Sequence, residues 1–253
     1  MSSTIQLDND GPFDVYLASP PDGVPVKGGL VVIHEIWGLV DQIRGVADRF
    51  AAEGWVVAAP DILSRGGITP ELGEELAAIR AGDDEEAKNA AQTRMREAST
   101  PRNSPEYGVW AVASLQKVLD HLDQQAGCTG HLAVTGFCFG GSYSFALAAA
   151  DPRVKAAVPF YGSPPETSDL SKIQAPILAF YGDEDTRLIE GLPEVTAGMA
   201  AAGVDFTPTV YAGTGHAFFN ERNPHAYNAE YAAQAWDAAR AFLDEHAAAA
   251  GQA

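Results

Sequence analysis

Short apolar runs recur along the chain and alternate with segments of helical periodicity. Six runs are predicted to be strands, at 30–34, 55–59, 132–135, 156–161, 177–181 and 206–211. The first two are continuously apolar, which is typical of strands buried on both faces of a parallel sheet. Apolar spacing of three to four residues predicts helices at 41–53, 142–150, 192–202 and 227–246. This alternation predicts an α/β fold with a mostly parallel central sheet and helices on both faces, in one domain over residues 1–253.

Residues 66–105, called the excursion segment below, interrupt this alternation. They contain charged helical pieces at 71–80 and 83–97 and a Ser-, Thr- and Pro-rich end, without a convincing strand. A long excursion from a compact sheet frequently covers a site. We therefore expect a helical lid or cap here, with a solvated surface excursion as the alternative.

The chain is strongly acidic. Asp and Glu number 34 against 16 Lys and Arg, for a formal net charge of -18. Such a surface repels nucleic-acid phosphates and anionic lipid headgroups, which argues against both as partners. No apolar stretch approaches the roughly 20 residues that span a bilayer, and the first residues do not resemble a signal peptide. Two cysteines cannot form a disulfide scaffold, so we expect a cytoplasmic protein. The expected partner is a small molecule, and the expected oligomeric state is a monomer or a homodimer.

The segment 136–141, Gly-Phe-Cys-Phe-Gly-Gly, carries the strongest chemical signal. It follows a predicted strand and opens a predicted helix, so it has the G-x-C-x-G form of a nucleophile elbow. The nucleophile of such a turn has a strained backbone, and the residues two positions away from it need to lack a Cβ. The positive end of the helix favours a thiolate. We therefore predict Cys138 as a nucleophile and not Cys128; the alternative is a buried, inert cysteine.

Two further chemical groups follow predicted strands in the order of a catalytic triad. Asp183 and Asp185 come just after the strand 177–181, and His216 comes after the strand 206–211. Nucleophile, acid and histidine in this order, each at the carboxyl end of a parallel strand, are typical of α/β-hydrolases. Asp185 is favoured over Asp183 by its offset from the strand. Its predicted task is to accept a hydrogen bond from Nδ1–H of His216.

Glu35 stands in the loop after the first buried strand, in the sequence His-Glu-Ile-Trp-Gly. In this fold the loop supplies one N–H of the oxyanion hole, predicted here to be that of Ile36, and Phe139 supplies the other. A charged carboxylate beside a developing oxyanion would repel it. Glu35 is therefore predicted to be a base that takes the thiol proton and is neutral when the oxyanion forms, with a surface acid or a loop acceptor as the alternative.

Several motifs together resemble those of the dienelactone hydrolase family, the carboxymethylenebutenolidases. They are Glu-Ile-Trp-Gly at 35–38, Pro-Asp-Ile-Leu at 60–63, the elbow at 136–141, Gly-Asp-Glu-Asp at 182–185 and Gly-His-Ala-Phe at 215–218. The resemblance extends over roughly residues 28–242 and implies an α/β-hydrolase that opens enol-lactones without a cofactor. It also implies roles for four residues: Cys138 as nucleophile, Asp185 and His216 as the rest of the triad, and Glu35 as the group that deprotonates the thiol once substrate has moved it.

The chain departs from this family at one position. Four residues after the catalytic histidine the family has an arginine, which helps to bind a substrate carboxylate and holds the resting glutamate; this chain has Asn220. An uncharged side chain there predicts a preference for neutral or longer lactones and esters. The predicted substrate contacts are Trp37, Phe218, Asn220 and Arg222. Cations that could replace the missing arginine from the excursion segment are Arg94, Arg96 and Arg102.

Other functions fit the sequence less well. The chain has no G-x-G-x-x-G after a strand, no P-loop and no cluster with metal-ligand spacing, so neither a cofactor nor a metal is predicted. A cysteine-elbow amidotransferase or PfpI-type enzyme would carry a late H-x-E pair, whereas Ala217 and Phe218 follow the histidine. A non-catalytic ligand-binding protein of the same fold is a third alternative, and the complete set of chemical residues disfavours it.

Overall fold

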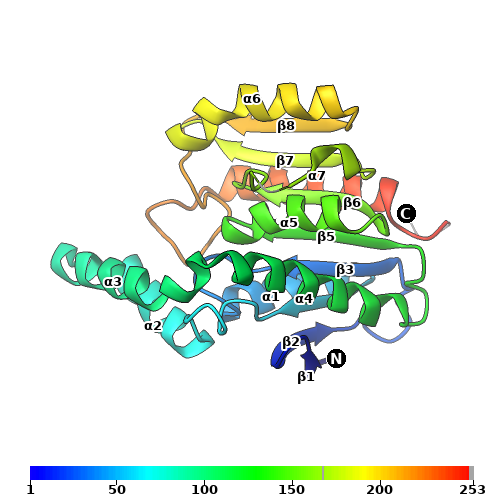
Figure 1. The fold of residues 1–253 in the computed structure, drawn as a ribbon, viewed down its shortest axis with the longest axis horizontal. Helices are drawn as coiled ribbons and strands as arrows, with labels where there is room; N and C mark the ends of the chain where they lie inside the picture. Colours follow the sequence, from blue (N-terminus) through cyan, green and yellow to red (C-terminus); the bar gives the residue numbers. More distant parts are fainter. Residues whose placement is uncertain (167, 251–253) are drawn as a thin grey trace.

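Eight strands form one mixed sheet in the spatial order β1-β2-β4-β3-β5-β6-β7-β8 (Figure 1). The computed structural model describes residues 1–166 and 168–250. From β4 to β8 every neighbouring pair is parallel, while β1 and β2 form an antiparallel hairpin and β2 also pairs antiparallel with β4. The strands are β1 (Ser2–Asp8), β2 (Pro12–Ala18), β3 (Gly28–Ile33), β4 (Trp55–Pro60), β5 (Leu132–Phe137), β6 (Val154–Phe160), β7 (Ile177–Gly182) and β8 (Phe206–Tyr211).

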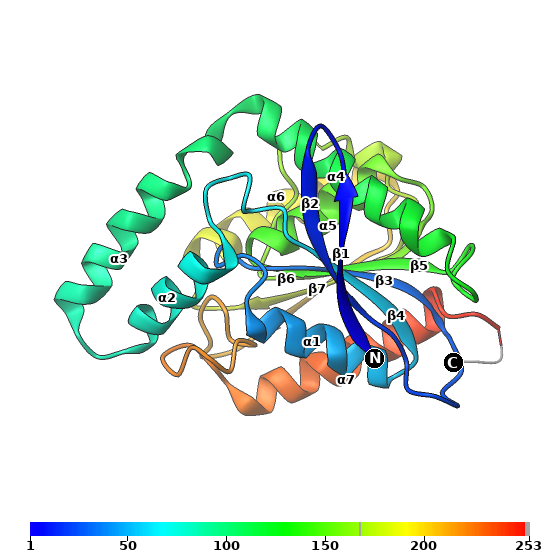
Figure 2. The ribbon, with the colours of Figure 1, turned by 90° about the horizontal axis from the view of Figure 1, so that it is seen from below.

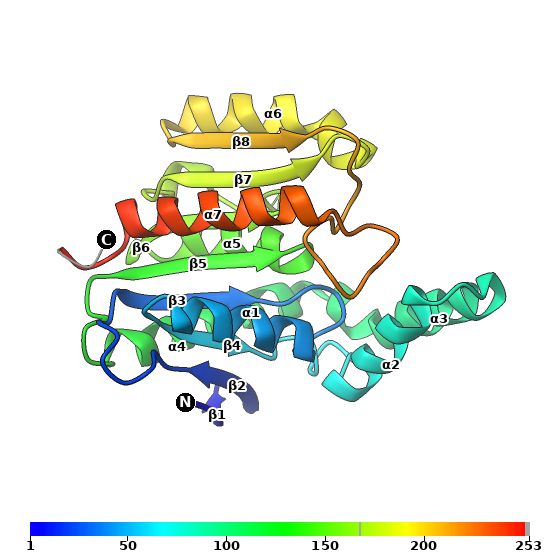
Figure 3. The ribbon, with the colours of Figure 1, turned by 180° about the vertical axis from the view of Figure 1, so that it is seen from behind.

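Helices cover both faces of the sheet (Figures 2 and 3). One face carries α1 (Asp41–Ala52) and α7 (Ala229–His246). The opposite face carries α4 (Pro105–Asp123), α5 (Phe139–Ala150) and α6 (Thr186–Ala202). The central strands β3, β5 and β7 are therefore buried at every position, as continuous apolar runs predict. Among the described residues, no helix is both long and apolar enough to cross a membrane.

The six predicted strands all form, so the predicted α/β class is confirmed. The hairpin β1–β2 and helix α4 are not among the predicted elements. β1 is exposed or half-buried at all of its positions, so it lacks the continuous apolar run that marks a buried strand. Helix α4 directly follows the excursion segment, whose charged pieces obscure where a new helix begins; its buried stripe includes Trp110, Leu115 and Leu119.

The excursion segment contains two helices, α2 (Pro70–Ala81) and α3 (Glu85–Ala98), and a short 3-10 helix, η1 (Thr100–Asn103). Side chains at the N-caps explain where the two helices begin, since Thr69 accepts from the N–H of Leu72 and Asp84 from two N–H groups of α3. Figure 1 shows both helices beyond the carboxyl ends of the strands. Together with the loop before α2 they form a small apolar cluster separate from the main core. Its residues are Leu63, Ile68, Leu76, Ala91 and Met95.

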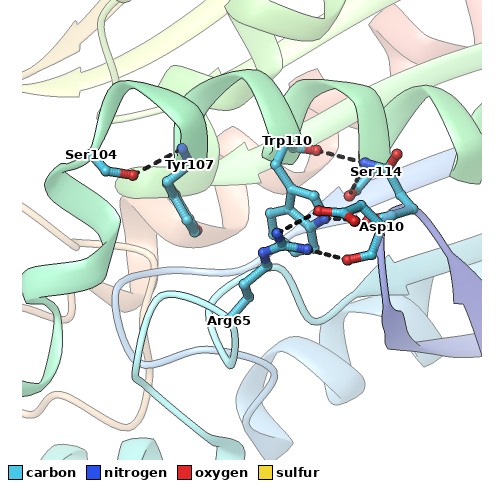
Figure 4. A network of polar contacts seen from close by, with 7 residues as sticks. Asp10, Arg65, Ser104, Tyr107, Trp110 and Ser114 are labelled. Atoms are coloured by element: carbon cyan, nitrogen blue, oxygen red, sulfur yellow. Dashed lines mark hydrogen bonds and ion pairs between the residues drawn. The ribbon is translucent and has the colours of Figure 1, made fainter.

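Polar contacts fasten the β1–β2 turn to α4 (Figure 4). The amide Nδ2 of Asn9 donates to the carbonyl of Trp110 at 3.1 Å and to Oγ of Ser114 at 2.9 Å, while the indole of Trp110 donates to the Asn9 carbonyl at 2.6 Å. Arg65 reaches the same place, pairing with Asp10 at 2.9 Å and lying 4.8 Å from the centre of the Trp110 ring. The hairpin and the loop just before the excursion segment are thus held by one helix.

Glycines permit the close packing of β5 and α5 at the carboxyl end of the sheet. A Cβ on Gly136 would lie 2.2 Å from the carbonyl oxygen of Gly140, and one on Gly140 would lie 2.2 Å from the carbonyl oxygen of Ile33. Real Cβ atoms do not approach backbone oxygens this closely. The predicted requirement for residues without a Cβ on either side of Cys138 is therefore confirmed.

We predict that Gly136→Ala will lower the free energy of unfolding by about 1–3 kcal/mol or prevent folding, because the new methyl group overpacks the strand-to-helix turn. The matched control is Gly45→Ala, in the middle of α1, where a Cβ has nothing within 4 Å. That variant should be more stable than the original protein by up to about 1 kcal/mol, because alanine favours helix. Chemical denaturation measures both. Equal stability of the two variants would contradict the packing described here.

Candidate active site

Cys138 lies between the end of β5 and the start of α5, with φ 55° and ψ -110°. Its N–H donates to the carbonyl of Phe160 at 3.0 Å, and its own carbonyl accepts from Ser142 at 3.1 Å. A positive φ is strained for a residue with a side chain, and such strain concentrates at functional sites. In the described part of the chain, Tyr161 and Ala217 near the same place also have positive φ, at 38° and 64°. The backbone around this thiol is therefore unusual on three separate segments.

Asp185 and His216 meet on one side of the thiol. Asp185 follows β7 as the N-cap residue of α6, and His216 lies in the loop after β8. Nδ1 of His216 hydrogen bonds to a carboxylate oxygen of Asp185. The competing acid, Asp183, instead accepts from the N–H groups of Gly213, at 2.7 Å, and Thr214, at 3.3 Å. Asp183 thus supports the histidine loop, while Asp185 holds the ring.

The His216 ring favours its protonated form. Burial alone would lower its pKa, but hydrogen bonds and charge from Asp185 and Cys138 outweigh burial and raise the pKa of His216 to about 10. A protonated imidazole beside a cysteine stabilises the thiolate once the thiol has lost its proton. Cys128 is different, because burial and the nearby charge of Asp123 raise the pKa of its thiol to about 11. The two cysteines are thus chemically distinct.

Glu35 lies in the same cluster and is only 2% exposed. The hydroxyl of Tyr161 donates to Oε1 at 2.9 Å, and Nδ2 of Asn220 donates to Oε2 at 2.6 Å. Burial raises the pKa of Glu35, while these two hydrogen bonds and the charge of His216 act in the opposite direction. Burial, and after it the charge and hydrogen bond of Glu35, raise the pKa of Tyr161, with a smaller effect from Cys138. The thiol, imidazole, phenol and carboxyl groups are therefore electrostatically linked.

The two predicted oxyanion donors flank the thiol. The N–H of Phe139 lies at the N-terminal end of α5, directly after Cys138, and Ile36 borders the same cavity as Cys138. Within residues 1–166 and 168–250, neither N–H donates to another protein group. A free backbone N–H beside a nucleophile can stabilise an oxyanion.

A cavity of about 530 Å³ opens above these groups. Part of its wall is formed by Glu35, Ile36, Trp37, Cys138 and His216. The rest comes mainly from α2 and α3 of the excursion segment and from the loop 223–226. Contacts join these outer parts. Arg222 pairs with Glu74 of α2 at 3.0 Å, and Nε2 of His225 lies 3.2 Å from the carbonyl oxygen of Gly82. The excursion segment therefore forms part of the cavity wall.

The predicted substrate contacts separate into three groups. Trp37 lines the cavity. Phe218 is fully buried against the rings of Tyr161 and Tyr211, so it supports the site from behind. Asn220 donates a hydrogen bond to Glu35, and Arg222 forms an ion pair with Glu74.

The predicted replacement cations do not line the cavity. Arg94 pairs with Glu75 at 2.6 Å, and Arg102 lies against the ring of Phe139. The cations in the wall are Arg80 and Lys88 instead. Helical spacing could have indicated Lys88, since residues 88, 91, 92 and 95 line the cavity from one side of α3. Tyr161 is not among the site residues predicted from the sequence, although it directly follows β6 at the carboxyl end of the sheet.

No group of three or more His, Cys, Asp or Glu side chains in the described residues could hold a metal ion. The candidate site combines a cysteine on an elbow with a histidine and an aspartate at the carboxyl ends of parallel strands. These features define the class of α/β-hydrolases.

Comparison with known proteins identifies the family. The model of the dienelactone hydrolase family matches residues 13–247, so the chain belongs to that family. A Saccharolobus solfataricus protein provisionally named a carboxymethylenebutenolidase is 30% identical, over 96% of this chain and 98% of its own. Protein usf of Aquifex pyrophilus is also 30% identical, over 91% and 92%.

Solved structures share the fold. A Klebsiella pneumoniae protein provisionally named a dienelactone hydrolase superposes with a TM-score of 0.80 at 23% identity, over 97% of this chain and 99% of its own. The dienelactone hydrolase-like promiscuous phosphotriesterase P91, from metagenomic libraries, gives a TM-score of 0.75 at 22% identity, over 98% and 99%. At these identities the likeness establishes the fold.

Proposed function

We propose that the protein hydrolyses small lactones or esters through a thioester on Cys138. The observation that carries this proposal is the strained backbone of Cys138, placed beside a histidine whose other nitrogen is bound to Asp185. Family membership supports hydrolysis, and the relatives named carboxymethylenebutenolidases support a lactone as the substrate. No cofactor or metal is part of the proposal.

Acylation follows from the positions of these groups. The thiolate of Cys138 attacks the carbonyl carbon, a C–S bond forms, and the carbonyl electron pair moves onto oxygen. The N–H groups of Ile36 and Phe139 stabilise this oxyanion. When the oxyanion collapses, the C–O bond to the leaving group breaks, and the His216 imidazolium gives its proton to the departing oxygen. In a lactone the leaving oxygen stays attached to the acyl chain, so the ring opens.

Deacylation uses the same groups. Neutral His216 removes a proton from a water molecule, which attacks the thioester carbonyl, and collapse of the second oxyanion releases the carboxylic acid and the sulfur of Cys138. Asp185 holds the ring in one tautomer through both steps. Enol esters suit this cycle because their leaving groups are good.

Glu35 is the proposed acceptor of the thiol proton when substrate enters. In the resting structure both of its oxygens are held, by Tyr161 and by Asn220. Asn220 is neutral, so it holds the carboxylate less strongly than a cation would. A carboxyl group whose pKa is raised by burial is a stronger base than an exposed one. Proton transfer leaves Glu35 neutral, so it does not oppose the oxyanion. After deacylation Glu35 returns this proton to the thiolate of Cys138, which restores the resting thiol.

Cys138→Ala should abolish ester hydrolysis, because no other nucleophile occupies the elbow. Cys138→Ser should retain only weak activity, since a carboxylate is a poor base for an alcohol. Cys128→Ala is the matched control and should turn over substrate like the original protein, because that thiol lies outside the site. Steady-state rates with p-nitrophenyl acetate test this. Retention of more than a few per cent of activity by Cys138→Ala would disprove the proposal.

Glu35→Gln should slow alkylation of Cys138 by about 100-fold, the usual contribution of a positioned base. The same variant should become more stable than the original protein as pH rises. A raised carboxyl pKa contributes stability at low pH that is lost as pH rises through that pKa, whereas glutamine does not titrate. Iodoacetamide kinetics and unfolding at about pH 5 and pH 8 measure these effects.

The control for this experiment is His216→Asn. Alkylation that is unchanged in Glu35→Gln but slowed in His216→Asn would assign the thiol proton to the histidine alone. That result would remove Glu35 from the mechanism.

Neutral substrates should be preferred over carboxylated ones. Besides the catalytic His216, the cavity wall carries two cations, Arg80 and Lys88, and two carboxyl groups, Glu35 and Glu85. Lys88 is paired with Glu85 at 2.8 Å. We therefore expect a higher kcat/KM for an uncharged lactone than for carboxylated dienelactone of similar leaving group. Asn220→Arg should shift this ratio toward the carboxylated substrate.

A displaced cation would give the opposite pattern. If the original protein prefers the carboxylated lactone, and Arg80→Gln loses that preference while Arg96→Gln keeps it, Arg80 binds the carboxylate. Arg96 is a suitable control because it lies on α3 outside the cavity wall. The specificity claim would then be wrong, while the mechanism at Cys138 would be unaffected.

A further inference from the structure

His34 is fully buried at the end of β3, beside the active site but outside the cavity wall. Its Nδ1 lies 2.8 Å from the carbonyl oxygen of Glu35, and the N–H of Ile62 donates to its Nε2 at 3.3 Å. A carbonyl oxygen accepts and an N–H donates, so the two partners require a neutral ring with its proton on Nδ1. Burial lowers the pKa of His34, in agreement with a neutral ring.

The hydrogen bond from Nδ1 acts on the peptide unit that carries an oxyanion donor. The carbonyl of Glu35 and the N–H of Ile36 belong to the same peptide group, which is planar and trans. The C=O bond of Glu35 and the N–H bond of Ile36 therefore point in opposite directions. When the ring of His34 holds the carbonyl on the protein side, the N–H of Ile36 is directed to the other side. A second contact helps, since the N–H of Gly38 donates to the same carbonyl at 3.2 Å.

His34 also contacts the segment that supplies the other donor. Its ring stacks on the ring of Phe139, with centroids 5.7 Å apart and planes 2° apart. Its carbonyl oxygen accepts from the N–H of Gly140 at 3.0 Å, which links the end of β3 to the first turn of α5. Both predicted donors, Ile36 and Phe139, are thus positioned by the same buried residue.

We propose that His34 is a positioning residue of the oxyanion hole. By holding the Glu35 carbonyl it orients the N–H of Ile36, and by packing on Phe139 it fixes the distance between the N–H groups of Ile36 and Phe139. This inference rests on the proposed function of Cys138. It differs from a purely structural role because it affects one class of reaction at the thiol: acyl transfer develops an oxyanion, whereas alkylation by iodoacetamide displaces iodide at a saturated carbon and develops none.

The experiment compares His34→Asn, His34→Gln and His34→Leu. The amide of asparagine can occupy the place of Nδ1 and donate to the Glu35 carbonyl, whereas that of glutamine lies nearer the place of Nε2, and leucine offers no donor. We expect kcat/KM for ester hydrolysis to fall about 100-fold in His34→Leu and His34→Gln, comparable to the loss of one oxyanion donor, and less than 10-fold in His34→Asn. Alkylation of Cys138 should change by less than about threefold in all three variants, since this reaction forms no oxyanion.

A transition-state readout makes the test sharper. An aldehyde inhibitor forms a hemithioacetal whose oxygen occupies the oxyanion hole, so its affinity should fall by the same factor as kcat/KM. Parallel losses of alkylation and hydrolysis would show that His34 only maintains the fold, and equal activity of the asparagine and glutamine variants would show that the Nδ1 contact is irrelevant. If the His34→Leu variant does not fold, the comparison of His34→Asn with His34→Gln tests the contact from Nδ1 by itself. Residual hydrolysis in Cys138→Ala would refute the proposed function itself, independently of these ratios.

Discussion

The strained backbone of Cys138 is the constraint on which the rest of the site depends. A side chain at φ 55° is unfavourable, so the surrounding structure has to hold it in place. The glycines at 136 and 140 allow the packing that does so, because any Cβ there would meet a backbone oxygen at 2.2 Å. This packing brings β3, β5 and the first turn of α5 together. The thiol, the N–H of Phe139 and the loop of Glu35 consequently lie together at the carboxyl ends of the central strands.

Two carboxyl groups serve this thiol in different environments. Asp185 binds the ring of His216 and raises the pKa of that ring against the effect of burial. Glu35 is buried between a phenol and a neutral amide, so its pKa is raised. One acid is therefore the partner of the imidazole, and the other is suited to exchange a proton. The formal charge of -18 says nothing of this division, which depends on local contacts.

Much of this could be predicted from the sequence, because the information is local. Continuous apolar runs indicate buried parallel strands, and a strand followed by G-x-C-x-G indicates the elbow, so Cys138, Asp185 and His216 could be placed at strand ends. The hairpin β1–β2 could not, since its first strand buries little. Contacts between distant segments were also inaccessible. Tyr161 and Asn220 lie 126 and 185 residues from Glu35, and the cations of the wall depend on how the excursion segment folds back.

The proposed mechanism requires a covalent bond between the acyl group of the substrate and the sulfur atom of Cys138. The most direct measurement is intact-protein mass spectrometry of samples quenched in acid within the first turnovers of an activated ester. The account predicts a mass increase equal to the acyl group, located by digestion on the peptide of Cys138 and removed by neutral hydroxylamine, as a thioester is. A burst of leaving group without any acylated protein, or acylation of a different residue, would contradict it.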